Sequence, residues 1–482
     1  MMATEMAPLA KVGGLADVVG ALAPALVRLG HEVRVILPRY AAIDAAKHGL
    51  KPAGAVMRAE VGPSGAKVPV DLLVSDEHFG RPGIYNDPKD GKGYPDNAER
   101  FIFFQKAALS HLKATGFRPD VIHCHDHQTA LVPAYLKMQL SSDPFFAGVA
   151  SLITIHNLGY QGLFPPEVLQ IAGFDASLFY PVSPFEFWGK VNFMKIGLCF
   201  ADVITTVSPT YAREITGPEQ GCGLEGVLAS RRDDLFGVLN GIDDQYWSPS
   251  KDPHIQDHYD LKSQAGKAKC KTALLSTMEL PPPPARKRVP VIGIISRLTE
   301  QKGFDLIEKA LPSLMQRELR LVVLGSGEPR YVQMLQSARE SHPGKVGVRI
   351  GFDEALAHLI EAGSDMFLMP SLYEPCGLNQ MYSLAYGTVP IVRATGGLAD
   401  TVREEGDNPN GFVFRPYDAG QMMAAIERAL AAYADRVGWT RLMKAGMKGD
   451  YSWTASAATY AELYARAAGR AERGVANTAR SA

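Results

Sequence analysis

A pair of cations and a carboxylate follow short apolar runs in the second half of the chain. Arg297 and Lys302 come after residues 291–295, and Glu374 comes after residues 367–369. Both runs are typical of buried parallel strands, and open α/β sheets bind ligands beyond the carboxyl ends of their strands. Two fixed cations there could stabilise the charge that builds on a departing diphosphate. Taken alone, the cations also fit a solvated loop.

The segment after Glu374 predicts two helix starts beside adjacent strands. Residues 374–377 open a helix that is expected to reach about Tyr386, residues 389–392 form the next strand, and Gly396-Gly397 lead into another helix. Free N–H groups at such starts suit an anionic or hydroxyl-rich ligand. An acid in front of a helix can also be only a cap.

A second glycine-containing loop lies near the N-terminus. Lys11, Gly13 and Gly14 precede a predicted helix of residues 15–29, and the glycines would let a ligand approach the backbone. A tight turn beside a solvated lysine explains the loop equally well. Only residues 1–4 precede the loop as a strand, and we hypothesise that a few further N-terminal residues complete this strand in the natural protein.

Three histidines alternate at the end of another predicted strand, residues 120–124. His123, His125 and His127 would share one face of this strand. No fourth ligand and no H-x-x-x-H helix accompany them, so the pattern favours a structural or sugar-binding role and no metal site.

The elements that position these residues alternate along the chain, which is typical of an α/β protein. Strands are predicted at residues 31–37, 120–124, 151–155, 202–207, 236–239, 291–295, 321–324, 367–369 and 389–392. Helices are predicted at residues 15–29, 101–115, 185–200, 418–433 and 453–467.

Length and composition limit the classes of function. A chain of 482 residues predicts two or three domains. A net charge of -1 argues against a nucleic-acid surface or a polybasic membrane anchor. No apolar run approaches the ~20 residues of a membrane span. The 5 cysteines are scattered without a C-x-x-C pair, which is typical of a reduced compartment, and we expect a cytoplasmic protein.

Several strings give the chain a family resemblance. The strings are K-V-G-G at residues 11–14, S-R-L-T-E-Q-K-G at 296–303, E-P-C-G-L-N-Q at 374–380 and T-G-G-L-A-D-T at 395–401. They resemble bacterial glycogen synthases and plant starch synthases, which are retaining glycosyltransferases of the GT-B fold. Many other GT-B enzymes carry a second Glu eight residues after the first. Tyr382 occupies that position here, which favours the glycogen and starch synthase branch.

The resemblance implies an architecture of two Rossmann-like domains facing an interdomain cleft. Residues 1–240 would form the N-terminal domain on the glucan acceptor side. A C-terminal helix of about residues 453–482 would cross back and complete this domain. Residues 241–452 would form the domain that binds the nucleotide-sugar donor.

The resemblance also implies a set of site residues. The catalytic residues would be Lys11, His156, Arg297, Lys302 and Glu374. The substrate-binding residues would be Lys11, Gly13, Gly14, Asp126, His156, Asn240, Arg297, Lys302, Phe352, Glu374, Cys376, Gly377, Leu378, Thr395, Gly396 and Gly397. The cations would hold the diphosphate, Phe352 the nucleobase, and Glu374 the glucose.

The implied reaction transfers glucose from ADP-glucose to the non-reducing 4-hydroxyl of an α-1,4-glucan, either glycogen or a malto-oligosaccharide, with retention and without a cofactor or metal. No residue decides adenine against uracil, and ADP-glucose is preferred because bacterial members mostly use it. One alternative is another GT-B glucosyltransferase with a different donor or a small acceptor, such as sucrose or trehalose synthase. The other is a non-catalytic glucan-binding protein with a decayed site. Such a protein would have lost Lys11, Arg297, Lys302 or Glu374, and all four are present in this sequence.

Overall fold

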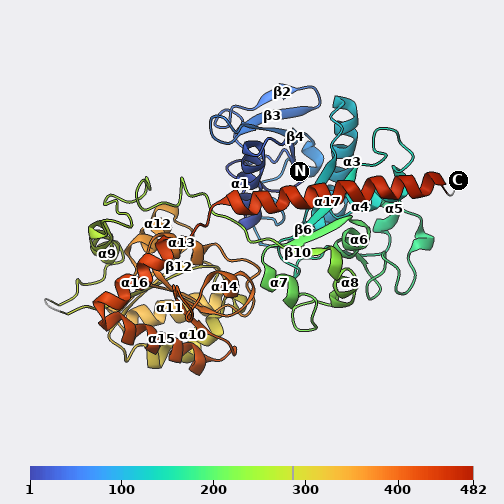
Figure 1. Cartoon of the computed structure of the whole chain (residues 1–482). Coiled ribbons are helices and arrows are strands. Elements are labelled where there is room, and N and C mark those ends of the chain that lie inside the picture. The colour runs from blue at the N-terminus through green and yellow to red at the C-terminus, as the bar shows by residue number, and fades with distance from the viewer. Residues whose placement is uncertain (285–286, 481–482) are drawn as a thin grey trace. The chain divides into compact units, whose positions relative to one another are not determined.

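The computed structural model describes residues 1–284 and 287–480, with side chains as far as residue 471. The chain divides into two compact units (Figure 1). Unit 1 comprises Met1–Gly241 together with the C-terminal segment that begins at Trp453, and unit 2 comprises Ile242–Ser452.

Unit 1 is built on two four-stranded sheets. One has the order β1-β4-β3-β2, and the other, β10-β9-β6-β5, is parallel throughout. A further antiparallel pair joins β7 and β8. The strands are β1 (Val35–Pro38), β2 (Lys51–Ala53), β3 (Val56–Val61), β4 (Val68–Leu73), β5 (Val121–His125), β6 (Ala150–Ile155), β7 (Leu163–Phe164), β8 (Val191–Asn192), β9 (Val203–Thr206) and β10 (Leu235–Gly237).

The first residues of the chain connect the two sheets of unit 1. Met2 forms parallel bridges to Ile36 in β1 and to Cys124 in β5. The Met2 N–H donates to the His123 carbonyl at 2.8 Å, and the Ile36 N–H donates to the Met1 carbonyl at 2.9 Å. This segment therefore supplies the backbone partners that β1 and β5 need on the sides facing it.

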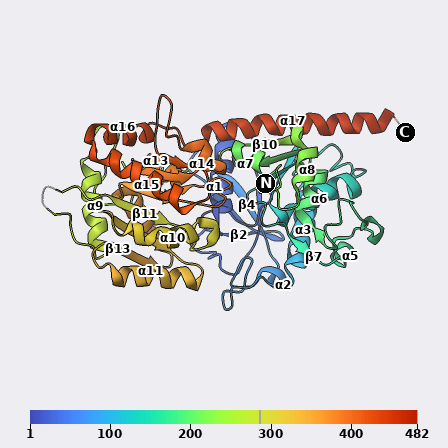
Figure 2. The same cartoon turned by 90° about the horizontal axis from the view of Figure 1, so that it is seen from below.

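Helices cover the sheets of unit 1, and the long C-terminal helix is one of them. These helices are α1 (Gly14–Arg28), α2 (Asp76–Phe79), α3 (Asn97–Thr115), α4 (Val132–Ala134), α5 (Val168–Ala172), α6 (Phe193–Phe200), α7 (Pro209–Glu214), α8 (Glu225–Ser230) and α17 (Trp453–Arg480). Leu22 and Leu26 of α1 share a core cluster with Trp453 and Tyr460 of α17 and with Leu152 of β6. In both views α17 runs along unit 1 (Figures 1 and 2).

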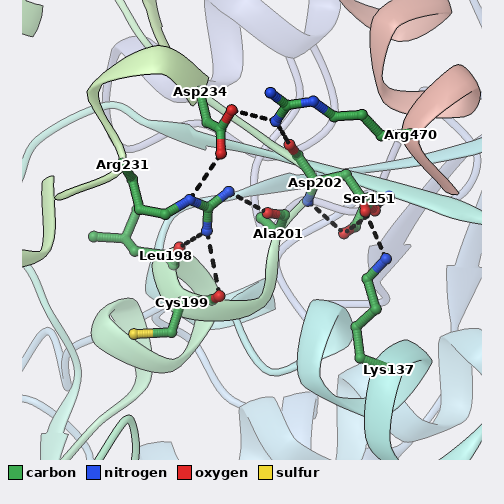
Figure 3. A network of polar contacts seen from close by, with 9 residues as sticks. All are labelled: Lys137, Ser151, Leu198, Cys199, Ala201, Asp202, Arg231, Asp234 and Arg470. Atoms are coloured by element: carbon green, nitrogen blue, oxygen red, sulfur yellow. Dashed lines mark hydrogen bonds and ion pairs between the residues drawn. The ribbon is translucent and has the colours of Figure 1, made fainter. Parts of the chain in front are cut away.

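A polar network holds α17 at the end of the sheet where β6 and β9 begin (Figure 3). The Arg470 guanidinium donates to the Asp202 carbonyl at 2.9 Å and forms an ion pair with Asp234. Arg231 donates to the same Asp234 carboxylate at 2.9 Å. Arg231 also donates to the carbonyls of Leu198 at 2.6 Å and of Ala201 at 2.7 Å, where α6 ends. Arg231 thus caps carbonyls that have no intrahelical donor.

Unit 2 contains one six-stranded parallel sheet with the order β13-β12-β11-β14-β15-β16. The strands are β11 (Val291–Ile295), β12 (Arg320–Gly325), β13 (Val346–Ile350), β14 (Met366–Met369), β15 (Val389–Arg393) and β16 (Phe412–Phe414). Because β11 is flanked by β12 and by β14, the chain reverses its direction of growth between β11 and β14. Doubly wound sheets bind ligands at such a switch point.

Two apolar cores cover the two faces of this sheet, as expected for parallel strands buried on both sides. Helices α10, α11 and α15 pack in one core, and α9 and α12 pack in the other. The helices of unit 2 are α9 (Ala265–Thr277), α10 (Phe304–Leu314), α11 (Pro329–Ser341), α12 (Glu354–Gly363), α13 (Asn379–Ala385), α14 (Gly396–Thr401), α15 (Ala419–Ala434) and α16 (Arg436–Met447).

The helix predicted for residues 185–200 is wrong in its first half. Only α6 (Phe193–Phe200) is helical, and residues 185–192 form a turn and strand β8. The Phe187 and Lys190 backbones exchange two hydrogen bonds across a turn, which a helix cannot accommodate. The strand predicted for residues 31–37 starts at Val35, because the His31 N–H still bonds to the Leu26 carbonyl of α1.

No helix within the described part of the chain is long and apolar enough to cross a membrane.

Replacing the capping arginine tests the network of Figure 3. Arg231→Met should lower the free energy of unfolding by about 2–3 kcal/mol, because the α6 carbonyls lose a charged donor and Asp234 loses a partner. The exposed neighbour provides a matched control, and Arg232→Met should change stability by less than ~0.5 kcal/mol. Equal denaturant midpoints for the two variants would contradict the capping role.

Candidate active site

Most of the predicted site residues of unit 2 follow β11, β14 or β15, around the switch point between β11 and β14. Arg297 and Lys302 follow β11, and Glu374 follows β14. Gly303 has a φ of +81°, and a Cβ added there would lie 2.2 Å from the Pro370 carbonyl oxygen. Only glycine permits this approach, which brings the turn carrying Lys302 against the end of β14.

Glu374 and Lys302 form a largely buried ion pair. The Lys302 Nζ donates to Glu374 Oε2 at 2.6 Å and to Oε1 at 2.9 Å. Ser371 Oγ donates to Oε2 at 2.9 Å. Glu374 is only 6% exposed, so its charge depends on these donors rather than on water.

Glycines bring the Glu374 loop against the loop that opens α14. Gly396 has a φ of +44°, and a Cβ there would lie 1.9 Å from the Glu374 carbonyl oxygen. A Cβ at Gly397 would lie 2.1 Å from the Cys376 carbonyl oxygen. The two loops are therefore in direct backbone contact, with Thr395 as the residue that precedes α14.

The helix expected to open at residues 374–377 begins only at Asn379. Gly377 has a φ of +70°, which excludes it from a right-handed helix, and Leu378 is the N-cap residue. The Gly397 N–H donates to the carbonyls of Glu374 at 3.3 Å and Pro375 at 3.1 Å. This N–H group is therefore engaged within the loop pair.

Arg297 and Phe352 lie at the surface of unit 2. Arg297 donates to Gln301 Oε1 at 3.0 Å and is exposed. Phe352 follows β13 and is 87% exposed, so its ring is open to a planar ligand. Asp353 beside it caps α12 by accepting from the Leu356 N–H at 2.9 Å.

In unit 1, the buried carboxylate of Glu5 organises the Lys11 loop. Glu5 Oε2 accepts from the N–H groups of Val12 at 2.5 Å and Gly13 at 2.8 Å, while Oε1 accepts from Tyr85 at 2.6 Å. Gly14 begins α1, and Lys11 is paired with Asp17 at 2.7 Å. Glu5 was not among the predicted residues. Its only signal in the sequence is an acid between a short strand and two glycines.

Asp126 and His156 come together at the carboxyl ends of β5 and β6. Asp126 Oδ1 accepts from the His156 N–H at 2.8 Å. Burial raises the pKa of Asp126 to about 7, and the Glu5 carboxylate adds to this rise. Burial lowers the pKa of His156 to about 3, so its ring is neutral at pH 7.

His125, one of the alternating histidines for which the sequence favours a structural or sugar-binding role, belongs to the same cluster. Its Nδ1 lies 2.9 Å from His156 Nε2, so one of these nitrogens donates to the other. Burial holds the pKa of His125 and of His123 well below the usual value, so neither ring brings a charge. His123 Nδ1 contacts the Tyr464 hydroxyl of α17 at 2.8 Å. The contact with His125 fixes the orientation of the His156 ring.

Asn240 lies after β10 and is 7% exposed. Its Oδ1 is buried and accepts no hydrogen bond in the described structure. A buried acceptor without a donor is costly, and a ligand hydroxyl would satisfy it.

Among the side chains that the structure describes, which reach residue 471, no group of three or more His, Cys, Asp or Glu residues is placed to hold a metal ion. His127, the third of the alternating histidines, instead contacts the Tyr160 carbonyl at 3.1 Å.

Comparison with known proteins gives two family matches that cover most of the chain. Residues 1–230 match the starch synthase catalytic domain, and residues 279–441 match the glycosyl transferases group 1 model. A glycogen synthase of Syntrophotalea carbinolica is 46% identical over 97% of this chain and 98% of its own. Glycogen synthase 2 of Geobacter metallireducens is 48% identical over 96% of this chain and 97% of its own.

Solved structures give a similar result. The catalytic domain of starch synthase IV from Arabidopsis thaliana, bound to ADP and acarbose, superposes with a TM-score of 0.87 at 35% identity, covering 97% of this chain and 98% of that one. A sucrose-phosphate synthase from Thermosynechococcus elongatus shares the fold, with a TM-score of 0.61 at 18% identity over 96% of this chain and 97% of that one.

A double-mutant cycle measures the energy of the buried pair. Lys302→Met and Glu374→Gln should each lower the free energy of unfolding by about 2–4 kcal/mol, with a coupling above ~1.5 kcal/mol, because either change alone leaves a buried group without its partner. The exposed pair Glu308–Arg330 is the control, with an expected coupling below ~1 kcal/mol. Equal coupling energies in the two cycles would contradict the inference that burial strengthens the Lys302–Glu374 pair.

Proposed function

We propose, because the chain belongs to the glycogen and starch synthase family and is a glycosyltransferase, that it transfers glucose from ADP-glucose to an α-1,4-glucan. The acceptor is the 4-hydroxyl at the non-reducing end, and the anomeric configuration is retained. The observation that carries this proposal is the Glu374–Lys302 pair at the switch point of unit 2.

In the proposed reaction, unit 2 binds the donor. Arg297 and Lys302 lie where open α/β sheets bind phosphates, and both can stabilise the charge on the departing nucleoside diphosphate. Lys11 of unit 1 is a further cation that the family resemblance implies for the diphosphate. The Glu374 carboxylate accepts hydrogen bonds from glucose hydroxyls, together with the backbone of Cys376, Gly377 and Leu378.

Retention needs no nucleophile from the protein in this scheme. The acceptor hydroxyl attacks the anomeric carbon on the face from which the diphosphate leaves. The new C–O bond forms as the bond from carbon to the phosphate oxygen breaks, and a phosphate oxygen takes the hydroxyl proton. The buried pair keeps Glu374 next to an ammonium group, which suits a role in binding rather than in attack.

In unit 1, the polar groups of Asp126, His156 and Asn240 suit a neutral sugar. His156 is uncharged at pH 7 and can exchange hydrogen bonds with hydroxyls. Asn240 offers a buried oxygen without a donor, and Asp126 offers a carboxyl that gains or loses its proton near pH 7. His156 and Asn240 carry no charge at pH 7 and Asp126 is only partly ionised, which fits a neutral polysaccharide acceptor.

The proposal also names the nucleobase of the donor, the need for a cofactor and the compartment. Phe352 would stack on the nucleobase, and adenine is proposed because the Arabidopsis starch synthase IV domain was solved with ADP. The family resemblance implies neither a metal nor another cofactor. The protein would act in the cytoplasm on glycogen or on malto-oligosaccharides.

Incorporation of labelled glucose into glycogen tests the proposal. ADP-glucose should support incorporation and UDP-glucose should support much less. Glu374→Gln should lower the rate by on the order of 100-fold, because the amide loses the charge that orders Lys302 and the sugar. Glu308→Gln, a change at an exposed pair of the same unit, should leave the rate unchanged. A preference for UDP-glucose would overturn the donor, and an active Glu374→Gln would overturn the site.

A further inference from the structure

Trp188 occupies the tip of a two-residue turn in unit 1. The Phe187 N–H donates to the Lys190 carbonyl at 2.7 Å, and the Lys190 N–H donates to the Phe187 carbonyl at 3.0 Å. Trp188 has a φ of 52° and Gly189 a φ of 76°. Positive φ at both central residues is the geometry of a type I′ turn, in which Asn-Gly is the favoured pair.

Tryptophan is a poor choice for this position on local grounds. A bulky side chain with positive φ is a backbone outlier, and its strain destabilises the fold. Burial does not compensate for this cost, because Trp188 is 84% exposed. A large apolar ring held in strain and in water signals a binding role.

Hydrogen bonds from Lys195 and to Glu186 hold the backbone of this turn in place. The buried Lys195 Nζ donates to the Ser183 carbonyl at 2.8 Å and the Glu186 carbonyl at 2.5 Å. Glu186 Oε1 accepts from the Gly189 N–H at 2.8 Å. Phe187 lies so close to Gly223 that a Cβ on the glycine would be 2.9 Å from the ring. The backbone that carries the exposed indole is therefore already ordered before a ligand binds.

A chain of contacts links this turn to the cluster of Asp126, His125 and His156 in unit 1. Gln161 Nε2 donates to the Cys222 carbonyl at 3.0 Å, next to Gly223. A Cβ on the following Gly162 would lie 2.5 Å from the His127 ring. His127 adjoins Asp126, which holds His156. The turn that carries Trp188 thus belongs to one continuous part of unit 1 with Asp126 and His156, which the proposed function assigns to the acceptor.

We propose that Trp188 is a stacking subsite for the acceptor glucan, at rings remote from the reacting end. A pyranose ring has an apolar C–H face that packs on an aromatic ring and a hydroxyl rim that needs polar neighbours. Glu186, whose Oε1 accepts from the adjacent Gly189 N–H, and Lys190, two residues after Trp188, are polar residues of the same turn. This inference rests on the proposed function, because it names a further part of the same acceptor site.

The subsite has a defined kinetic consequence. It contacts only acceptors long enough to reach it, so it lowers the KM for glycogen. It touches neither the donor nor the reacting hydroxyl, so kcat, the KM for ADP-glucose and the KM for maltotriose do not depend on it. A role in stability alone would produce no such separation.

Trp188→Asn is the decisive variant, because it removes the ring and installs the residue that the turn favours. Its stability should equal or exceed that of the parent. Glycogen affinity, measured by retardation in glycogen-containing native gels and as KM, should weaken roughly five- to tenfold. Kinetics with maltotriose should be unchanged. Trp188→Tyr should retain most of the affinity.

Val437 provides a matched control, since it is a 70% exposed apolar residue of unit 2. Val437→Asn should bind glycogen like the parent. Unchanged glycogen affinity in Trp188→Asn would overturn the inference. So would a change in sedimentation coefficient without a change in affinity, because the ring would then serve self-association. If the parent chain neither binds nor elongates glycogen, the proposed function fails as well.

Discussion

A carboxylate that is removed from water needs a cationic partner, and Glu374 is such a carboxylate. Its partner Lys302 comes from a turn that reaches the end of β14 only because Gly303 lacks a side chain. The loops that carry Glu374 and Gly396 touch backbone to backbone, again through glycine. The strand order of unit 2 places this assembly at the one edge of the sheet where a ligand meets free strand ends. The fold itself therefore fixes the positions of Glu374 and Lys302, and an anionic ligand would share Lys302 with Glu374.

The parts of the fold that sequence reasoning predicts well are those set by local pattern. The apolar run at residues 291–295 matches β11, and the runs at residues 367–369 and 389–392 match β14 and β15 within a residue. The GT-B fold implied by the resemblance is confirmed by the likeness to the starch synthase catalytic domain. The assignment of roles to Lys11, Asp126, His156, Asn240 and the residues of unit 2 stays a prediction. Their surroundings now supply physical reasons for it, such as the orphaned oxygen of Asn240.

The remaining features depend on contacts between residues far apart in the chain, which no local pattern encodes. The aromatic content of residues 185–200 predicted one helix, but Lys195 holds the carbonyls of Ser183 and Glu186 and forces a turn. Glu5 becomes significant only when its carboxylate meets the N–H groups of the Lys11 loop. His125 becomes significant only when β5 and β6 bring it to His156. Trp188 is recognised as unusual only once its φ and its exposure are known.

The central claim is that glucose is added in α-1,4 linkage at non-reducing ends with retained configuration. Exhaustive digestion of the labelled glycogen product with β-amylase tests this claim most directly, because that enzyme removes maltose from non-reducing ends and cleaves only α-1,4 bonds. The proposed reaction predicts that essentially all incorporated label is released as maltose, in proportion to the nucleoside diphosphate formed. Label that stays in the resistant core, or release of nucleoside diphosphate without transfer to the glucan, would contradict it.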